Sequence, residues 1–96
     1  SGRPLAPYRS IAVDPSLFAL GTRLRAPALE GVRLPGGFVH DGCLVADDVG
    51  KAIRGAHVDL FAPAREAGRD LARRLPRQIV LGRDARCGAS PATLFR

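Results

Sequence analysis

Closely spaced glycine and proline residues constrain this chain more than any other feature. Its 96 residues include eleven glycines and eight prolines, which divide the sequence into short apolar runs. Glycine adds backbone freedom and proline removes a backbone donor, so both interrupt regular structure. None of the runs approaches the roughly 20 apolar residues that span a bilayer. The pattern therefore predicts several short strands joined by tight turns.

The apolar runs predict a mainly β fold with one helix. We expect strands at residues 9–13, 22–25, 38–40, 43–47, 58–61 and 78–81, with a shorter one at 32–34. Asp41-Gly42 is typical of a two-residue hairpin turn between neighbouring strands. Ala67, Leu71 and Leu75 recur at spacing four, which predicts a helix over 64–75 that ends before Pro76. Short strands with one helix favour a small barrel, because closure leaves few exposed edges.

The chain length predicts a single domain over residues 1–96, with a core at about 5–82 and a tail at 83–96. Cys43 and Cys87 are its two cysteines. They either form one disulfide, which would indicate an oxidising compartment, or remain two unpaired thiols. A zinc site needs more ligands than these cysteines and two separated histidines readily provide, so we expect no metal and no cofactor.

The net charge of +6 at pH 7 comes mostly from arginines spread along the chain. Such charge suits a polyanionic partner, namely nucleic acid, an anionic membrane surface or a cell-wall polymer, or it simply keeps the protein soluble. The sequence carries no nucleic-acid-binding motif, and with one tyrosine and no tryptophan it offers little for base stacking. Nucleic acid is therefore not the expected partner, and no transmembrane segment is predicted.

Three aspartates, Asp14, Asp48 and Asp59, each end or punctuate an apolar run. Three carboxylates could therefore meet at one edge of a small β structure. Alternate residues share a face of a strand, so Asp59 lies with His57 and Phe61. Carboxylates held close together resist joint ionisation, and a carboxyl that keeps its proton is a candidate general acid. On spacing alone the structural alternative is favoured: turn residues at 14 and 48, and an arginine partner for Asp59. Only a structural role is expected for Asp41, Asp47 and Asp84.

The order of these residues resembles a known family. Arg9-Ser10-Ile11-Ala12-Val13-Asp14-Pro15, then Leu20-Gly21-Thr22, then the Ala46–Asp59 stretch with Asp48-Val49-Gly50 are similar to the three-aspartate "3D" domain of membrane-bound lytic transglycosylase A. The similarity runs from about Leu5 to Gly82. It implies a small six-stranded double-psi β-barrel with one short helix. It also implies an enzyme that cleaves the β-1,4 bond between N-acetylmuramic acid and N-acetylglucosamine without water, leaving a 1,6-anhydro sugar.

The resemblance assigns roles to particular residues. Asp59 takes the position of the catalytic acid, which then acts as a base, and Asp48 and Asp14 take those of supporting aspartates. Substrate contacts are expected from the neighbouring polar residues His57, Arg54 and Lys51. Two of these depart from the family pattern, since Lys51 replaces a second glycine and Arg54 replaces a lysine. Full-length members also have a second domain that forms the opposite wall of the groove, and this chain shows none.

The leading hypothesis is a peptidoglycan lytic transglycosylase in the periplasm or secreted, whose export signal would lie outside this chain. One alternative is a non-catalytic glycan-binding or expansin-like module that loosens the wall. Another is an antibacterial toxin domain with the same chemistry. The expected partner is the peptidoglycan glycan strand, and the sequence does not indicate an inhibitor or a secretion partner.

Overall fold

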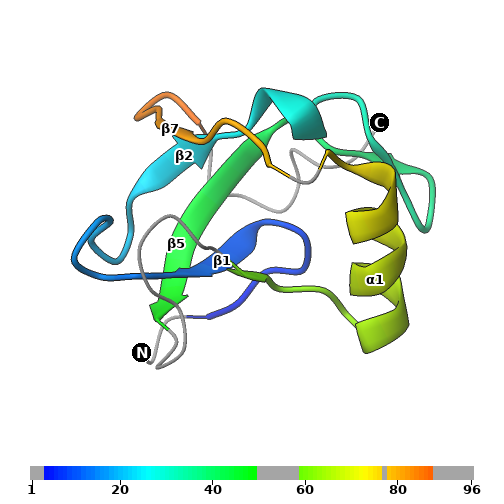
Figure 1. Ribbon diagram of the computed structural model, residues 1–96, viewed down its shortest axis with the longest axis horizontal. Helices are drawn as coiled ribbons and strands as arrows, with labels where there is room; N and C mark the ends of the chain where they lie inside the picture. Colours follow the sequence, from blue (N-terminus) through cyan, green and yellow to red (C-terminus); the bar gives the residue numbers. More distant parts are fainter. Residues whose placement is uncertain (1–3, 50–58, 77, 88–96) are drawn as a thin grey trace.

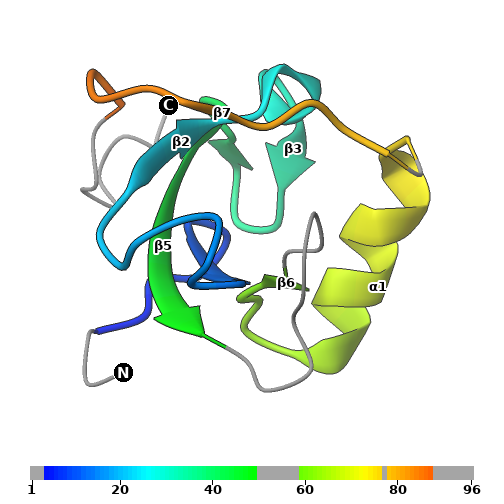
Figure 2. The same cartoon turned by 60° about the vertical axis from the view of Figure 1, so that its left-hand side comes forward.

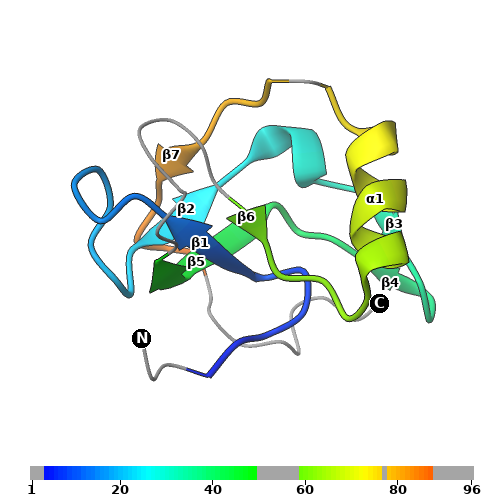
Figure 3. The same ribbon diagram turned by 60° about the horizontal axis from the view of Figure 1, so that its bottom comes forward.

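A computed structural model describes residues 4–49, 59–76 and 78–87. A five-stranded sheet has the order β6-β1-β5-β2-β7, of which Figure 1 labels β1, β5, β2 and β7. Strands β3 and β4 form a two-stranded sheet (Figure 3). The elements are β1 (Ser10–Val13), β2 (Arg23–Arg25), the 3-10 helix η1 (Pro27–Leu29), β3 (Arg33–Leu34), β4 (Phe38–Val39), β5 (Cys43–Val49), β6 (Asp59–Leu60), α1 (Arg65–Arg74) and β7 (Gly82–Arg83). The predicted mainly β fold with one helix is confirmed.

Strand β5 is the centre of the larger sheet. It runs parallel to β1 on one side (Figure 1) and antiparallel to β2 on the other (Figure 2). Its residues from Cys43 to Asp47 are all buried, which is typical of a strand with neighbours on both edges and cover on both faces. Within the described ranges the pairing ends at β6 and at β7, and no ladder joins these two strands. Closure into a double-psi barrel stays a prediction.

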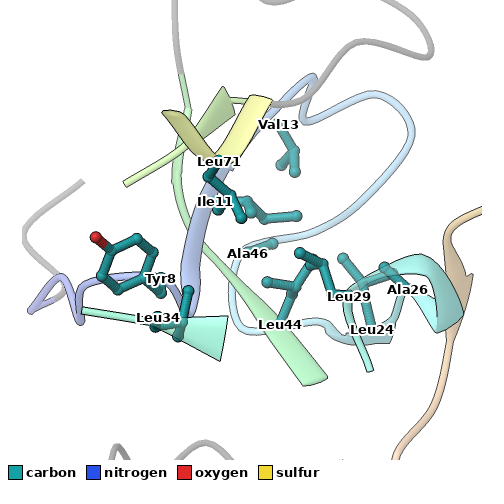
Figure 4. Packing of buried hydrophobic residues seen from close by; sticks show 10 residues of the cluster. All are labelled: Tyr8, Ile11, Val13, Leu24, Ala26, Leu29, Leu34, Leu44, Ala46 and Leu71. Carbon is teal, nitrogen blue, oxygen red and sulfur yellow. The ribbon is translucent and has the colours of Figure 1, made fainter. Parts of the chain in front are cut away.

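The core lies between the sheet and α1. Ile11 and Val13 of β1 and Leu44 of β5 are almost fully buried, and Leu71 of α1 joins them (Figure 4). Leu71 is the buried residue of α1, while Ala67 and Leu75 are partly buried against the same cluster. The spacing of four that predicted a helix over 64–75 therefore reflects one apolar stripe, and the helix is confirmed as Arg65–Arg74.

Two predicted features are wrong. Asp41-Gly42 is not a hairpin turn, because β4 pairs with β3 whereas β5 pairs with β1 and β2. Gly42 is still required, since its φ is +87° and an added Cβ would lie 2.6 Å from Cγ of Glu30. The last strand is not at 78–81 but at β7, where the backbone meets β2. Val80, in the expected strand, is 78% exposed.

Residues 83–87, which the sequence assigned to a tail, belong to the fold. Strand β7 pairs with β2, and the Asp84 carboxylate accepts a hydrogen bond of 2.9 Å from Nε of Arg25. Cys87 forms a disulfide with Cys43 at the start of β5, with their Cα atoms 5.3 Å apart. Residues 82–87 are therefore held against β2 and β5.

A partly buried ion pair ties the start of β1 to the start of β5. Arg9 is fully buried, and its guanidinium donates to both carboxylate oxygens of Asp41 at 3.1 and 3.2 Å and to the carbonyl of Cys43 at 2.7 Å. A buried arginine is tolerated when its charge is paired and its terminal nitrogens are hydrogen-bonded in this way. Arg9 is thus an anchor of the fold, and Asp41 has the structural role that the sequence predicted.

His40 lies buried beside the Arg9–Asp41 ion pair, and its burial leads us to predict that the stability of the protein depends on pH. Its Nε2 donates to the carbonyl of Tyr8 at 2.6 Å, and its Nδ1 accepts from the backbone N–H of Gly42 at 2.8 Å. Burial lowers the pKa of His40, because it penalises the charged ring. The unfolded chain therefore binds a proton more readily than the folded one as the pH falls below about 6.5. We expect the free energy of unfolding to decrease through that window.

Urea unfolding between pH 8 and pH 5 measures this effect. His40→Gln keeps one donor and one acceptor but does not titrate, so its free energy of unfolding should vary less over the same range. Equal pH slopes in the two proteins would contradict the assignment to His40.

Candidate active site

The sheet register places two of the three aspartates on either side of Ala12. Ala12 in β1 pairs with Asp48 in β5 and with Asp59 in β6. Laterally paired residues point to the same face of a sheet, and here that face is opposite to the one on which Ile11 enters the core. Two strand spacings separate the Cα atoms of the aspartates by about 10 Å. The methyl group of Ala12 leaves the space between them open.

A β-bulge sets the face on which Asp48 lies. The register shifts between Ile11 and Ala12, so that Ile11 pairs with Ala46 while Ala12 pairs with Asp48, and Asp47 is the extra residue. Without the bulge, Asp47 would occupy the position opposite Ala12 and Asp48 would turn to the core face. The bulge therefore brings Asp48 to the side of Asp59.

Asp47 is fixed within the bulge by the start of β1. Its buried carboxylate accepts a hydrogen bond of 2.6 Å from the hydroxyl group of Ser10. The Oγ of Ser10 in turn accepts a hydrogen bond of 2.7 Å from the N–H of Ala6. The sequence correctly gave Asp47 a structural role, but its importance for the site was missed. The only signal was the neighbouring pair of acidic residues at the end of an apolar run.

Asp59 is positioned by hydrogen bonds that extend beyond the two residues of β6. The N–H of Phe61 donates to the carbonyl of Ser10 at 2.9 Å, and the N–H of Tyr8 donates to the carbonyl of Phe61 at 2.7 Å. These bonds hold the backbone of this strand against β1. Asp59 itself is exposed, and Phe61, two residues on along the strand, is 37% exposed. An acidic and an apolar side chain therefore lie next to each other.

Both aspartates line a cavity of about 1390 Å³. Its lining includes Ala12, Asp48 and Asp59 from the outer face of the sheet and Ile11 and Leu60 from the core face. The cavity therefore reaches both sides of the edge strand β6. It continues beside α1, which a short connection joins to β6 (Figure 3). From the helix it is lined by Arg65, Gly68, Arg69, Leu71 and Ala72.

Asp14 is not part of this lining. It follows β1, is 8% exposed, and its Oδ1 accepts hydrogen bonds from the N–H and Oγ of Ser16 at 2.9 and 2.8 Å. This is the turn geometry that aspartate commonly adopts. The structure thus shows the turn role that the sequence held open for Asp14, and its supporting role in catalysis stays a prediction.

The predicted substrate contacts Lys51, Arg54 and His57 lie outside the described residues. Within the described ranges no group of three histidine, cysteine, aspartate or glutamate side chains is arranged to hold a metal ion. The part of the chain that the structure describes has no helix long and apolar enough to cross a membrane.

Comparison with known proteins identifies the family. No curated protein matches the sequence significantly. A family model described as the 3D domain matches residues 9–79, which is more than half of the chain and contains all three aspartates. The match also covers β1, β5, β6 and α1, the elements that border the cavity. The chain belongs to the 3D domain family.

Proposed function

We propose that this protein is a peptidoglycan lytic transglycosylase that uses Asp59 as its catalytic acid and base. The observation that carries the proposal is the placement of Asp48 and Asp59 on either side of Ala12, on one face of the sheet and in one cavity. The 3D domain family supports peptidoglycan as the substrate. Two carboxylates separated by the small side chain of Ala12 suit a reaction in which positive charge develops on a sugar ring.

The proposed reaction needs one residue that changes its role. Protonated Asp59 gives its proton to the glycosidic oxygen, and the bond from that oxygen to the anomeric carbon of the muramoyl sugar breaks. The Asp59 carboxylate then takes the proton of the muramoyl 6-hydroxyl while that oxygen bonds to the anomeric carbon. The products are a 1,6-anhydro end and a free 4-hydroxyl, and Asp59 regains its proton. No water is consumed.

The neighbouring residues support this reaction in different ways. Asp48, on the other side of Ala12, would stabilise the positive charge that develops on the ring. The exposed ring of Phe61 offers an apolar surface to a sugar bound beside Asp59. Helix α1 lines the part of the cavity beyond β6, so this chain contributes a second wall of its own.

Digestion of purified peptidoglycan tests the proposal. The soluble fragments should carry 1,6-anhydro ends, which mass spectrometry recognises because they are lighter by one water than reducing ends. Reducing ends would instead indicate a hydrolase. Binding to insoluble peptidoglycan without release of fragments would indicate the non-catalytic glycan-binding module. Either result would overturn the proposed reaction.

We also propose that the protein works in the periplasm or outside the cell. The disulfide between Cys43 and Cys87 supports this location, because such bonds persist in oxidising compartments and are rare in the reducing cytosol. Peptidoglycan, the proposed substrate, lies in the same compartments. Free-thiol titration of protein isolated from its native compartment should find both cysteines oxidised.

A further inference from the structure

Helix α1 carries two arginines into the cavity that holds the aspartates. Arg65 and Arg69 are one helical turn apart, and both line the cavity and are exposed. Neither forms an ion pair with another residue in the described ranges. By contrast, Arg74 at the other end of the helix is paired with Asp70 at 3.2 Å and donates to the carbonyl of Arg33 at 2.7 Å. Arg65 and Arg69 therefore give one part of the cavity a positive charge that no ion pair within the described ranges neutralises.

The helix itself gains nothing from this arrangement. Like charges at i and i+4 on a helix repel each other. Arg65 is also the first residue of α1, where the helix dipole disfavours a cation. Acidic side chains are available on the same helix, yet Glu66 and Asp70 are not part of the cavity lining. Among the described residues the two arginines therefore lack an acidic partner, and an anion bound in the cavity would supply one.

Small residues line the cavity between the two arginines. Gly68 and Ala72 complete this face of α1, and neither has a side chain long enough to cover a neighbouring guanidinium. A ligand in this part of the cavity would therefore meet the two charged groups directly. Guanidinium groups bind carboxylates and phosphates through paired hydrogen bonds, and a carboxylate is the anion that a peptide on the proposed substrate would supply.

The position of the pair relative to Asp59 indicates where that carboxylate comes from. Arg65 follows Asp59 by six residues, so their Cα atoms can be no more than roughly 20 Å apart. A short peptide attached to a sugar at Asp59 can span any distance up to this limit. Its carboxylates would be repelled by Asp48 and Asp59 and attracted towards α1.

We infer that Arg65 and Arg69 form an anion subsite that binds carboxylates of the peptide carried by the muramoyl sugar. The inference rests on the proposed function. It makes the protein selective for glycan strands that carry acidic peptides, and it gives the bound strand one orientation, with its peptide towards α1.

Two forms of one substrate test the selectivity. Solubilised peptide-bearing strands would be used either untreated or after coupling of their carboxylates to methylamine, which removes the charge and keeps the peptide. For the wild-type protein, neutralisation should lower kcat/KM about tenfold, as two partly exposed ionic contacts would predict. The double variant Arg65→Gln/Arg69→Gln should lose the same factor on untreated strands and show no preference.

Arg73→Gln is the matched control, because Arg73 is an exposed arginine of the same helix that does not line the cavity. It should keep the wild-type preference, and the preference should fall as salt is added. A double variant that still prefers untreated strands would overturn the inference, as would an equal loss in Arg73→Gln. Thermal melting should show that all three proteins are folded.

A second readout separates this inference from the proposed reaction. If wild-type protein releases no anhydro ends from either substrate, the proposed reaction fails, but the subsite can still be tested by co-sedimentation with untreated and neutralised peptidoglycan. Tighter binding to the untreated form that is lost in the double variant would support the subsite. Equal binding to both forms would overturn it.

Discussion

Asp59→Asn should lower the release of anhydro-muropeptides by about 1000-fold or more, within the range that positioned acid–base groups contribute. Asparagine has nearly the same shape but cannot donate a proton to the glycosidic oxygen or accept one from the 6-hydroxyl. The side chain is exposed at the edge of the sheet, so the free energy of unfolding should change by no more than about 0.5 kcal/mol. Rates would be measured by quantifying anhydro ends, and stability by urea unfolding.

Asp48→Asn is the matched comparison, since Asp48 lies on the same face on the other side of Ala12. If Asp48 only stabilises charge on the sugar ring, its replacement should cost about 100-fold. A larger loss in Asp48→Asn than in Asp59→Asn would mean that the two roles are reversed. Full activity in Asp59→Asn would remove Asp59 from the mechanism.

Loss of the disulfide should have the largest effect on stability. The bond joins residues 44 positions apart, and closure of a loop of this length stabilises a protein by about 4 kcal/mol in the chain-entropy model. Total stabilities are usually about 5–15 kcal/mol, so this is a large share for a small domain. Cys43→Ala/Cys87→Ala should therefore melt roughly 15–30 °C lower than the oxidised protein.

Dithiothreitol provides the control for this prediction. It should shift the melting temperature of the wild-type protein towards that of the double variant and leave the variant unchanged. Neither cysteine lines the cavity, so the variant should retain activity at temperatures where it is folded. A decrease in unfolding free energy of less than about 1 kcal/mol would show that the pairing of β7 with β2 holds this end of the chain without the bond.

The sequence predicts best the features that depend on neighbouring residues. The recurrence of Ala67, Leu71 and Leu75 identifies the helix because one stripe of α1 meets the core. Most strand positions follow from apolar runs between glycines and prolines. The hairpin at Asp41-Gly42 failed because turn chemistry describes the turn alone. It does not reveal that β5 finds its partners in β1 and β2, which lie much earlier in the chain.

The candidate site was predictable only in part, for the same reason. The places of the aspartates at strand ends indicated only that the three carboxylates could meet at one edge of the sheet, and the structure pairs two of them, Asp48 and Asp59, with Ala12. The bulge at Asp47 was not predictable, because it is a property of the register between two strands. The turn role of Asp14 and the cationic part of the cavity on α1 also required the folded arrangement.

Because of the bulge at Asp47, the inward and outward alternation of side chains differs between the first and second halves of β5. Before the bulge, Leu44 and Ala46 point into the core. After it, the alternation of side chains is shifted by one residue, so that Asp48 points to the outer face of the sheet. The two halves of β5 therefore meet different requirements, one from packing in the core and the other from the chemistry proposed for Asp48. What they share is length, so adding or removing a single residue near position 47 would disturb the site even if every functional side chain were kept.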